Sequence, residues 1–308
     1  MLDVITIGSA LVDIFIDSDK FHLKKSATGL WLCGKYDEKI EVNSFKVTSG
    51  GGGSNTAVGF ARMGFNTGVV AELGIDAWAL VLLNDFQQEG VDISLLIRER
   101  KEETGGSVIL SALDGGRTIM VHRGAASMLD AKDIPDHVLD QARWIHLSSI
   151  SGQQEALQKI FALVGRGRKQ LSWNPGNNEI ELLNSGKLNL AGLSVAVLFV
   201  NQKEWEGLVQ VQEQLHQQCV QIVVTNGGKG GAIYQLGQIV HQYQSEPVAV
   251  VNATGAGDSF AVGYVSAILN GRDLRDQANW GKKNAASVVG QVGAKAGLLT
   301  RDQIEKAV

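Results

Sequence analysis

Short apolar runs rich in β-branched residues alternate along this chain with longer segments of helical pattern, and this alternation limits the folds open to it. The runs cover residues 3–8, 67–73, 143–149, 169–174, 195–201 and 221–226. Because apolar residues occupy consecutive positions in them, they predict strands buried on both faces. Helical patterns lie between them, at residues 54–64, 76–90, 153–167 and 202–218. The sequence therefore predicts an α/β fold with a parallel sheet covered by helices on both faces.

Two stretches interrupt this alternation. Residues 14–49 and 94–122 contain shorter and more polar strand patterns, and Asp114-Gly115-Gly116 in the second stretch suits a tight hairpin turn. We predict that both stretches form a small β-sheet lid. The α/β core is then left with residues 1–13, 50–93 and 123–308.

Composition excludes several classes of protein. The formal net charge is −4 and no basic stripe is present, so we expect neither nucleic acid nor a membrane surface as a partner. The longest apolar stretches, such as residues 191–200, are too short to span a bilayer, and the N-terminus lacks the basic region of a signal peptide. Cys33 and Cys219 form no CxxC or Cys/His cluster, which favours a reducing compartment. We therefore expect a soluble, cytoplasmic protein.

The stretch VNATGAGDSFAVGYVSAIL, residues 251–269, carries the clearest chemistry. It predicts the end of a strand at 247–252, a glycine turn and then a helix. Gly255 and Gly257 let the backbone approach a ligand, and the free amides of a helix start suit phosphate. Asp258 among these amides either complements the helix dipole, worth under about 1 kcal/mol, or acts as a base. A base there takes the proton from an attacking hydroxyl while the amides hold the phosphoryl group.

Residues 252–258 also resemble a known signature. They are similar to the D-T-x-G-A-G-D motif of the ribokinase/phosphofructokinase-B family of carbohydrate and nucleoside kinases, and the departure that stands out is Asn252 in place of the first Asp. The resemblance implies that Asp258 is the catalytic base and that the amides of Gly255, Ala256 and Gly257 form an anion hole. In this family the first acid of the motif helps to hold a monovalent cation such as K⁺. Because Asn252 lacks the charge, we expect a weak or absent K⁺ site.

Residues 48–64 resemble the N-terminal signature of the same family, a glycine pair followed by Asn and A-x-x-x-A-R-x-G. The resemblance implies that Gly50 and Gly51 admit the substrate close to the backbone and that Asn55 bonds its hydroxyls. The same residues also fit a glycine-rich turn in which Ser54 or Asn55 caps a helix.

Asp13 lies among apolar residues, where an unpaired buried carboxylate is costly. It therefore either faces solvent at the edge of the lid or binds a ligand. In the family, the matching acid binds substrate hydroxyls.

Asp76 predicts a helix N-cap.

Two further patterns concern the residues on the nucleotide side. Asn201 and Glu204 form an N-x-x-E pattern that predicts a helix capping box. Asn-Gly in residues 223–234 predicts a hairpin. The resemblance places Asn201 and Glu204 near ATP, with Glu204 acting on Mg²⁺ through water. It adds four residues of the hairpin and one helical residue as ATP contacts: Thr225, Gly227, Gly228, Gly230 and Asn284.

The resemblance covers nearly the whole chain and implies a ribokinase-like, doubly wound fold with its active site at the carboxyl ends of the strands. It implies a phosphotransferase with an alcohol group as acceptor, which transfers the γ-phosphoryl group of ATP to a small sugar with Mg²⁺ as cofactor. A nucleoside kinase is the alternative, and a non-catalytic nucleotide- or sugar-binding relative is a further one. No G-x-G-x-x-G follows the first strand, which argues against a dinucleotide-dependent oxidoreductase. A homodimer through the lid is compatible with the resemblance.

Overall fold

The computed structural model describes residues 1–308 except 112–115, 135, 168, 191–192 and 308. Within the described residues, the main sheet has the strand order β16-β15-β14-β13-β12-β11-β1-β6. Its strands are β1 (Leu2–Ile7), β6 (Thr67–Val70), β11 (Ala142–Leu147), β12 (Gln170–Trp173), β13 (Val195–Asn201), β14 (Cys219–Thr225), β15 (Gly231–Gln235) and β16 (Gln238–Tyr243). The strands from β6 to β14 are mutually parallel, and β15 and β16 add antiparallel strands at one edge. The predicted α/β fold with a mainly parallel sheet is confirmed.

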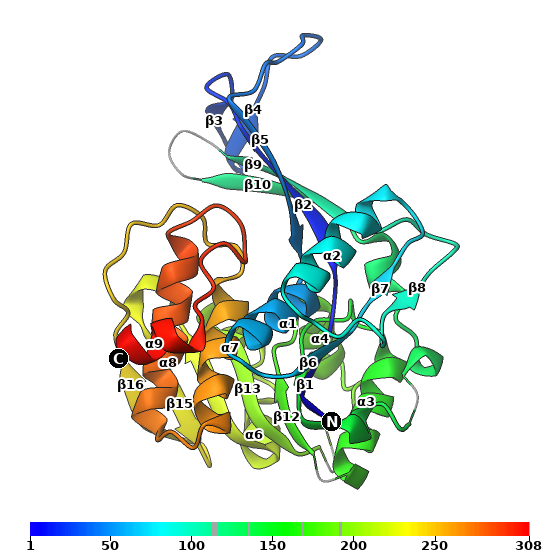
Figure 1. The fold of residues 1–308 in the computed structure, drawn as a ribbon. Coiled ribbons are helices and arrows are strands. Elements are labelled where there is room, and N and C mark those ends of the chain that lie inside the picture. Colours follow the sequence, from blue (N-terminus) through cyan, green and yellow to red (C-terminus); the bar gives the residue numbers. More distant parts are fainter. Residues whose placement is uncertain (112–115, 135, 168, 191–192, 308) are drawn as a thin grey trace.

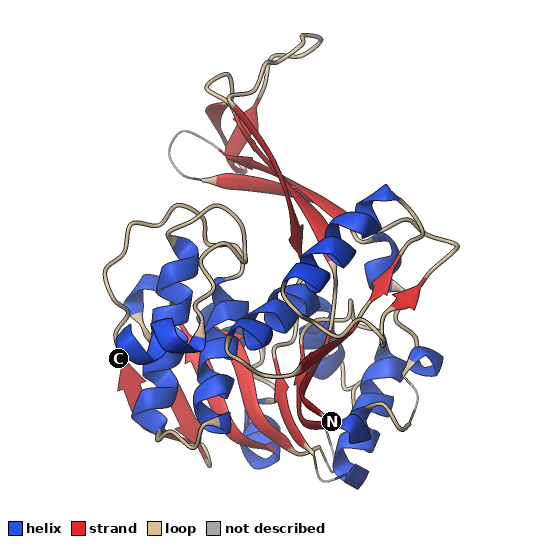
Figure 2. Ribbon diagram, in the orientation of Figure 1, coloured by secondary structure: helices blue, strands red, loops and turns tan. Residues whose placement is uncertain are grey.

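Helices cover both faces of this sheet (Figure 2). They are α1 (Gly52–Arg62), α2 (Ala77–Gln88), α3 (Gln154–Gly167), α4 (Asn177–Asn184), α5 (Gln202–Gly207), α6 (Gln212–Gln218), α7 (Ala256–Leu269), α8 (Leu274–Val289) and α9 (Arg301–Ala307). Short 3₁₀ turns occur at η1 (Gly124–Ser127), η2 (Ala131–Asp133), η3 (Leu139–Gln141) and η4 (Gly227–Lys229). The predicted helix at 202–218 is divided into α5 and α6.

Side chains along a central strand point alternately to the two faces of the sheet, and each face belongs to a different hydrophobic core. In β13, Leu198 and Val200 face a core that includes residues of α3, α4, α5 and α6. Val197 and Phe199 face the opposite core, which includes residues of α1, α7, α8 and α9. Because every second side chain of a strand points to the same face, one buried strand can serve both cores. The central strands therefore carry apolar residues at consecutive positions, as the sequence predicted.

The lid projects from the core as a separate small sheet (Figure 1). Its strand order is β10-β9-β2-β5, with β2 (Leu11–Asp17), β5 (Ser44–Gly50), β9 (Gly106–Ser111) and β10 (Arg117–His122). A hairpin of β3 (His22–Ser26) and β4 (Gly29–Cys33) lies between β2 and β5 in the chain. β8 (Ile97–Arg98) pairs instead with β7 (Glu72–Leu73). Most of the predicted hairpin turn at Asp114-Gly115-Gly116 lies outside the described residues.

The predicted strand at 247–252 is wrong. The chain has no strand there, and both Val251 N and Asn252 N donate to Val289 O, at 2.8 and 3.1 Å. Pro247 has no N–H with which to join a ladder. The segment therefore runs along helix α8, and its apolar side chains line a cavity instead of the interior of the sheet.

No helix in the described part of the chain is both long and apolar enough to cross a membrane.

Close backbone contact places helix α1 on the end of β1. The ideal Cβ position of Gly53 is 2.6 Å from Gly8 C, and Thr6 Oγ1 donates to Gly53 O at 3.1 Å. Real Cβ atoms essentially never come so near another atom, so glycine is required at position 53 for this approach.

We expect Gly53→Ala to lower the free energy of unfolding by about 1–3 kcal/mol, the usual cost of overpacking. Gly165→Ala in α3 is the matched control, since nothing lies within 4 Å of its ideal Cβ. Alanine there should stabilise the helix by up to about 1 kcal/mol. Urea unfolding followed by circular dichroism measures both variants, and equal midpoints for the two would contradict this packing argument.

Candidate active site

Helix α7 begins in a turn that only glycine can make. Gly255 has a φ of 78°, and its ideal Cβ position is 2.6 Å from Ala294 Cβ. The turn directs the first amides of α7 out of the helix. In the part of the chain that the structure describes, Gly257 N and Asp258 N bond no backbone acceptor. Ala256 N makes only a long bond, 3.4 Å, to Ala253 O. This start of α7 is an anion-binding geometry.

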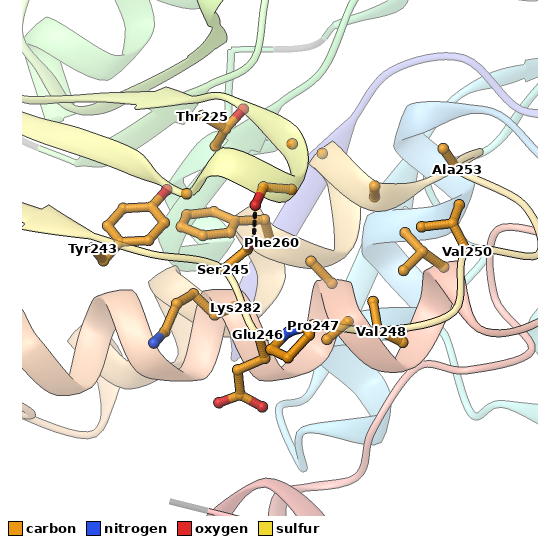
Figure 3. Close-up of a pocket in the computed structure, with 18 residues that line it drawn as sticks. Thr225, Tyr243, Ser245, Glu246, Pro247, Val248, Val250, Ala253, Phe260 and Lys282 are labelled. Carbon is orange, nitrogen blue, oxygen red and sulfur yellow. Dashed lines mark hydrogen bonds between the residues drawn. The ribbon is translucent and has the colours of Figure 1, made fainter.

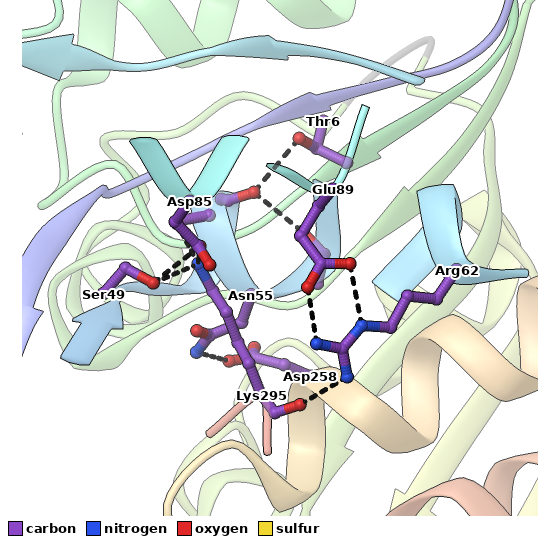
Figure 4. A network of polar contacts seen from close by, with 11 residues as sticks. Thr6, Ser49, Asn55, Arg62, Asp85, Glu89, Asp258 and Lys295 are labelled. Carbon is purple, nitrogen blue, oxygen red and sulfur yellow. Dashed lines mark hydrogen bonds and ion pairs between the residues drawn. The ribbon is translucent and has the colours of Figure 1, made fainter. Parts of the chain in front are cut away.

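Asp258 lies in the first turn of α7 and is held by Asn55 of α1 (Figure 4). Asn55 Nδ2 donates to Asp258 Oδ2 at 2.8 Å. Burial raises the pKa of Asp258, while the hydrogen bond from Asn55 and the charge of Lys295 lower it. A desolvated carboxylate with a single orienting donor is suited to accept a proton from a neighbouring hydroxyl.

Asn55 was expected to bond a substrate, and the structure pairs its amide nitrogen with Asp258 instead. Its Oδ1 is buried and has no hydrogen-bond partner among the described residues. Ser148 Oγ at the end of β11 is likewise buried without a described partner. The ideal Cβ position of Gly52 is 3.0 Å from Ser148 Oγ and 3.5 Å from Asp258 Oδ1. The sequence pattern did not single out Gly52 for this site.

Asp13 of β2 is 4% exposed and accepts a hydrogen bond from Ser107 Oγ. It therefore does not face solvent. A Cβ on Gly50 would overlap Asp13 Oδ2, so glycine at this position makes room for the carboxylate of Asp13. The sequence prediction was that Gly50 lets a substrate approach the backbone directly. Gly51 is the N-cap of α1 with a φ of 92°.

The two carboxylates of the site interact. Burial raises the pKa of Asp13, the bond from Ser107 and the charge of Lys295 lower it, and the charge of Asp258 raises it further. Asp13 and Asp258 therefore sense each other electrostatically although they come from opposite ends of the sequence. The lid and the core contribute one acid each to the same region.

A cavity of about 350 Å³ adjoins the start of α7 (Figure 3). Its lining includes the loop residues predicted for ATP, namely Thr225, Gly227, Gly228 and Gly230, together with Ala256 and Gly257 of the anion-binding turn. Apolar side chains form another wall, contributed by Val248, Val250, Ala285, Ala286 and Val289. The structure therefore brings the four predicted loop residues and the anion-binding turn together in one cavity, whereas the lining does not include Asn201, Glu204 or Asn284. Sequence reasoning missed the apolar wall because it assigned 247–252 to a strand.

The loop between β14 and β15 is the predicted hairpin. β14 and β15 are antiparallel, and Gly230 adopts a φ of 94°. A Cβ at this glycine would overlap Tyr243 O of β16. Gly230 thus permits the close packing of the loop that lines the cavity.

Asn201 and Glu204 form the predicted capping box at the start of α5. Glu204 N donates to Asn201 Oδ1 at 2.9 Å, and Asn201 N donates to Glu204 Oε2 at 2.8 Å. Burial raises the pKa of Glu204, and the bonds from Asn201 lower it. Asp76 is an N-cap as predicted, because it accepts a bond from Ala79 N at 2.9 Å.

Asn284 lies behind the cavity wall and not in it. Its side chain is buried, its Nδ2 donates to Ser259 O at 2.7 Å, and its Oδ1 accepts from Leu299 N at 2.9 Å. Both ends of this amide are used within the protein, where they fasten α8 to α7 and to the chain before α9. The predicted direct contact with the nucleotide therefore has no support in this geometry.

Comparison with known proteins identifies the class. A family model described as pfkB family carbohydrate kinase matches residues 1–301, and the chain therefore belongs to this family. It is a carbohydrate kinase, a phosphotransferase with an alcohol group as acceptor, and kinases of this family use ATP with Mg²⁺.

Individual relatives agree with this assignment. The chain is 27% identical to 2-dehydro-3-deoxygluconokinase of Bacillus subtilis (strain 168), over 89% of this chain and 91% of the relative. The fold is similar to that of Methanocaldococcus jannaschii nucleoside kinase, with a TM-score of 0.80, 22% identity and coverage of 99% and 97% of the two chains. It is also similar to Arabidopsis thaliana ribokinase complexed with ribose and ATP, with a TM-score of 0.77, 22% identity and coverage of 99% and 98%.

Asn252 departs from the family signature, and its geometry generates a prediction. It is 7% exposed, and its Oδ1 already accepts a bond from Thr254 N at 2.7 Å. The loop is therefore held by a neutral amide, which is a poor ligand for a hard cation. We expect activity to change little when K⁺ is replaced by a bulky organic cation. Asn252→Asp should gain K⁺ dependence in the same assay, and strong K⁺ activation of the wild type would show the prediction to be wrong.

Proposed function

We propose that this kinase transfers the γ-phosphoryl group of ATP to a hydroxyl of a small sugar, with Asp258 as base and the 255–258 backbone amides as anion hole. The observation that carries the proposal is the position of Asp258. Its carboxylate lies in the first turn of α7, beside the cavity on one side and near Asp13 of the lid on the other.

The reaction needs little covalent chemistry from the protein. The acceptor hydroxyl gives its proton to the carboxylate of Asp258 as its oxygen attacks the γ-phosphorus. The amides of Gly255, Ala256 and Gly257 stabilise the negative charge on the transferred group, and ADP leaves toward the cavity lined by Thr225 and the glycine loop. The lid would exclude water, which competes with the acceptor for the phosphoryl group.

The residues present fit Mg²⁺ bound through the nucleotide. In the described ranges of the chain, no group of three metal-ligating side chains occurs, and Mg²⁺ commonly binds through phosphates, waters and one carboxylate. Glu204 would hold it through water from the start of α5, since only its Oε2 is used in the capping box. The ion would neutralise charge on the phosphates.

A polyhydroxylated acceptor fits the unpaired polar groups of the site. Asn55 Oδ1 and Ser148 Oγ are buried without described partners, and a buried polar group without a hydrogen bond is costly. Sugar hydroxyls both donate and accept, so they can satisfy these atoms together with Asp13. One of the relatives named above is a 2-dehydro-3-deoxygluconokinase, and this name supports a sugar-type acceptor.

Consumption of ATP against a panel of pentoses, hexoses, deoxy keto-acid sugars and nucleosides tests the proposal. We expect turnover with at least one sugar well above the acceptor-free rate. Turnover with nucleosides alone would replace the sugar by a nucleoside. ATP binding without any turnover would indicate the non-catalytic alternative.

Asp258→Asn should lower kcat by about 10²–10⁴, the usual contribution of a positioned general base, and leave ATP binding nearly unchanged. Asp302→Asn is the matched control, because Asp302 is also an acid in the first turn of a helix, α9, but is exposed. Steady-state kinetics and calorimetric titration of ATP separate the two effects. Near-normal turnover of Asp258→Asn would remove Asp258 from the mechanism.

We also propose that the exposed face of the lid pairs with a second copy of the chain. Phe45 and Val47 of β5 and Met120 of β10 are exposed, with Phe45 62% exposed, and the strand register places all three on the face of the lid opposite to Asp13. Such apolar exposure on one small sheet is characteristic of an interface. Sedimentation equilibrium should show a dimer that Met120→Lys dissociates, and a monomeric wild type at micromolar concentration would contradict it. Both cysteines are free thiols, in keeping with the proposed cytoplasmic location.

A further inference from the structure

Lys295, in the segment after α8, is a buried cation that the proposed reaction does not use. Its side chain lies close to Phe86, and the residue is only 7% exposed. Its Nζ donates to Ser49 Oγ at 2.8 Å, to Ser54 Oγ at 2.6 Å and to Asp85 Oδ2 at 2.6 Å. An ammonium has three donors, so these partners occupy all of them. Lys295 therefore has no donor left for a substrate.

The three partners come from three different elements. Ser49 belongs to strand β5 of the lid, Ser54 to helix α1, and Asp85 to helix α2. Two of these partners immediately precede residues of the acceptor site. Ser49 is followed by Gly50, against which Asp13 lies, and Ser54 is followed by Asn55, which orients Asp258. A shift of either serine backbone therefore also shifts the neighbouring site residue, Gly50 or Asn55.

The backbone around Lys295 makes a second set of contacts. Lys46 Nζ of β5 donates to Val292 O at 3.0 Å, and Arg62 Nη1 of α1 donates to Lys295 O at 2.8 Å. Ala294 packs against Gly255, which forms the turn before the anion-binding amides. The segment 292–295 therefore touches the lid, helix α1 and the start of α7.

The charge of Lys295 acts on both acids of the site. It lowers the pKa values of Asp13 and Asp258, which burial raises. Burial lowers the pKa of Lys295 itself, and Asp85, Glu89 and Asp13 raise it. Glu89 is paired with Arg62 at 2.6 Å, and Arg62 is the other cation packed nearby. A buried ammonium surrounded by these carboxylates remains charged far more readily than an isolated one.

We propose that Lys295 is a positioning residue of this kinase, which holds lid strand β5, helix α1 and the turn at Gly255 in one arrangement and places a positive charge near the two acids of the site. The inference rests on the proposed role of Asp258 as base. Lys295 itself touches no substrate. It acts through Ser49 on the lid, through Ser54 on Asn55, and through its charge on Asp258.

Lys295→Gln tests the electrostatic part. Since kcat/KM requires ionised Asp258, loss of the positive charge should raise the pKa of Asp258 and move the acid limb of the kcat/KM profile to higher pH by about one unit. Lys132→Gln is the matched control, because Lys132 is a surface lysine whose side chain is 74% exposed. A purely structural role would lower activity without moving the limb. An unmoved acid limb in folded Lys295→Gln overturns the proposal.

Ser49→Ala tests the positional part and keeps the proposal testable if Lys295→Gln does not fold. It removes one acceptor but retains the charge. We expect KM for the acceptor to rise severalfold, KM for ATP to stay near the wild-type value, and the acid limb to stay in place. An unchanged KM for the acceptor overturns the proposal.

The outcome for Asp258→Asn distinguishes the two levels of inference. If that variant turns over normally, Asp258 is not the general base and the proposed function is wrong on this point. If it is inactive while Lys295→Gln and Ser49→Ala behave like wild type, only the role of Lys295 fails.

Discussion

The hydrogen bond from Asn55 to Asp258 joins the starts of helices α1 and α7, and the geometry of the candidate site depends on it. Both helices begin at glycines with positive φ, Gly51 at 92° and Gly255 at 78°. The helices also pack closely, because the ideal Cβ position of Gly59 lies 2.8 Å from Val262 Cγ2. Glycines thus let α1 and α7 approach until one amide reaches one carboxylate.

This hydrogen bond helps to explain how Asp258 can be ionised in a buried position. A carboxylate at the start of α7 gains from the free amides and the helix dipole, but burial opposes its ionised form. The bond from Asn55 and the charge of Lys295 offset part of that desolvation. The result is an ionisable group whose basicity is raised by burial and whose direction is set by α1. The same principle holds for Asp13, with Ser107 as the donor.

Local patterns in the sequence were sufficient for much of the fold. The buried strands and most helices follow from apolar periodicity, and the capping box of Asn201 and Glu204 follows from short-range spacing. The strand expected at 247–252 failed because the apolar character of Val248 and Val250 serves a cavity wall, which composition does not distinguish from a sheet. The helix at 202–218 divides after Gly207, and the periodicity of the window did not reveal that break.

Long-range contacts are what the sequence could not supply. Asn284 matched a nucleotide position, yet its amide binds Ser259 O and Leu299 N, and only the packed structure reveals these partners. Gly50 was expected to face a substrate, whereas the adjacent group is Asp13. Lys295 showed no motif at all, because its partners are brought together from distant parts of the chain.

The central claim is that Asp258 receives the proton of the acceptor hydroxyl while the amides at the start of α7 hold the phosphoryl group. A crystal structure with Mg²⁺, a non-hydrolysable ATP analogue and the acceptor found in the panel tests it most directly. If Asp258 is the base, the reacting hydroxyl lies within about 2.6–3.2 Å of one of its carboxylate oxygens, in line with a γ-phosphate that contacts the amides of residues 255–257. A reacting hydroxyl bonded to a different side chain, with the γ-phosphate away from these amides, would contradict it.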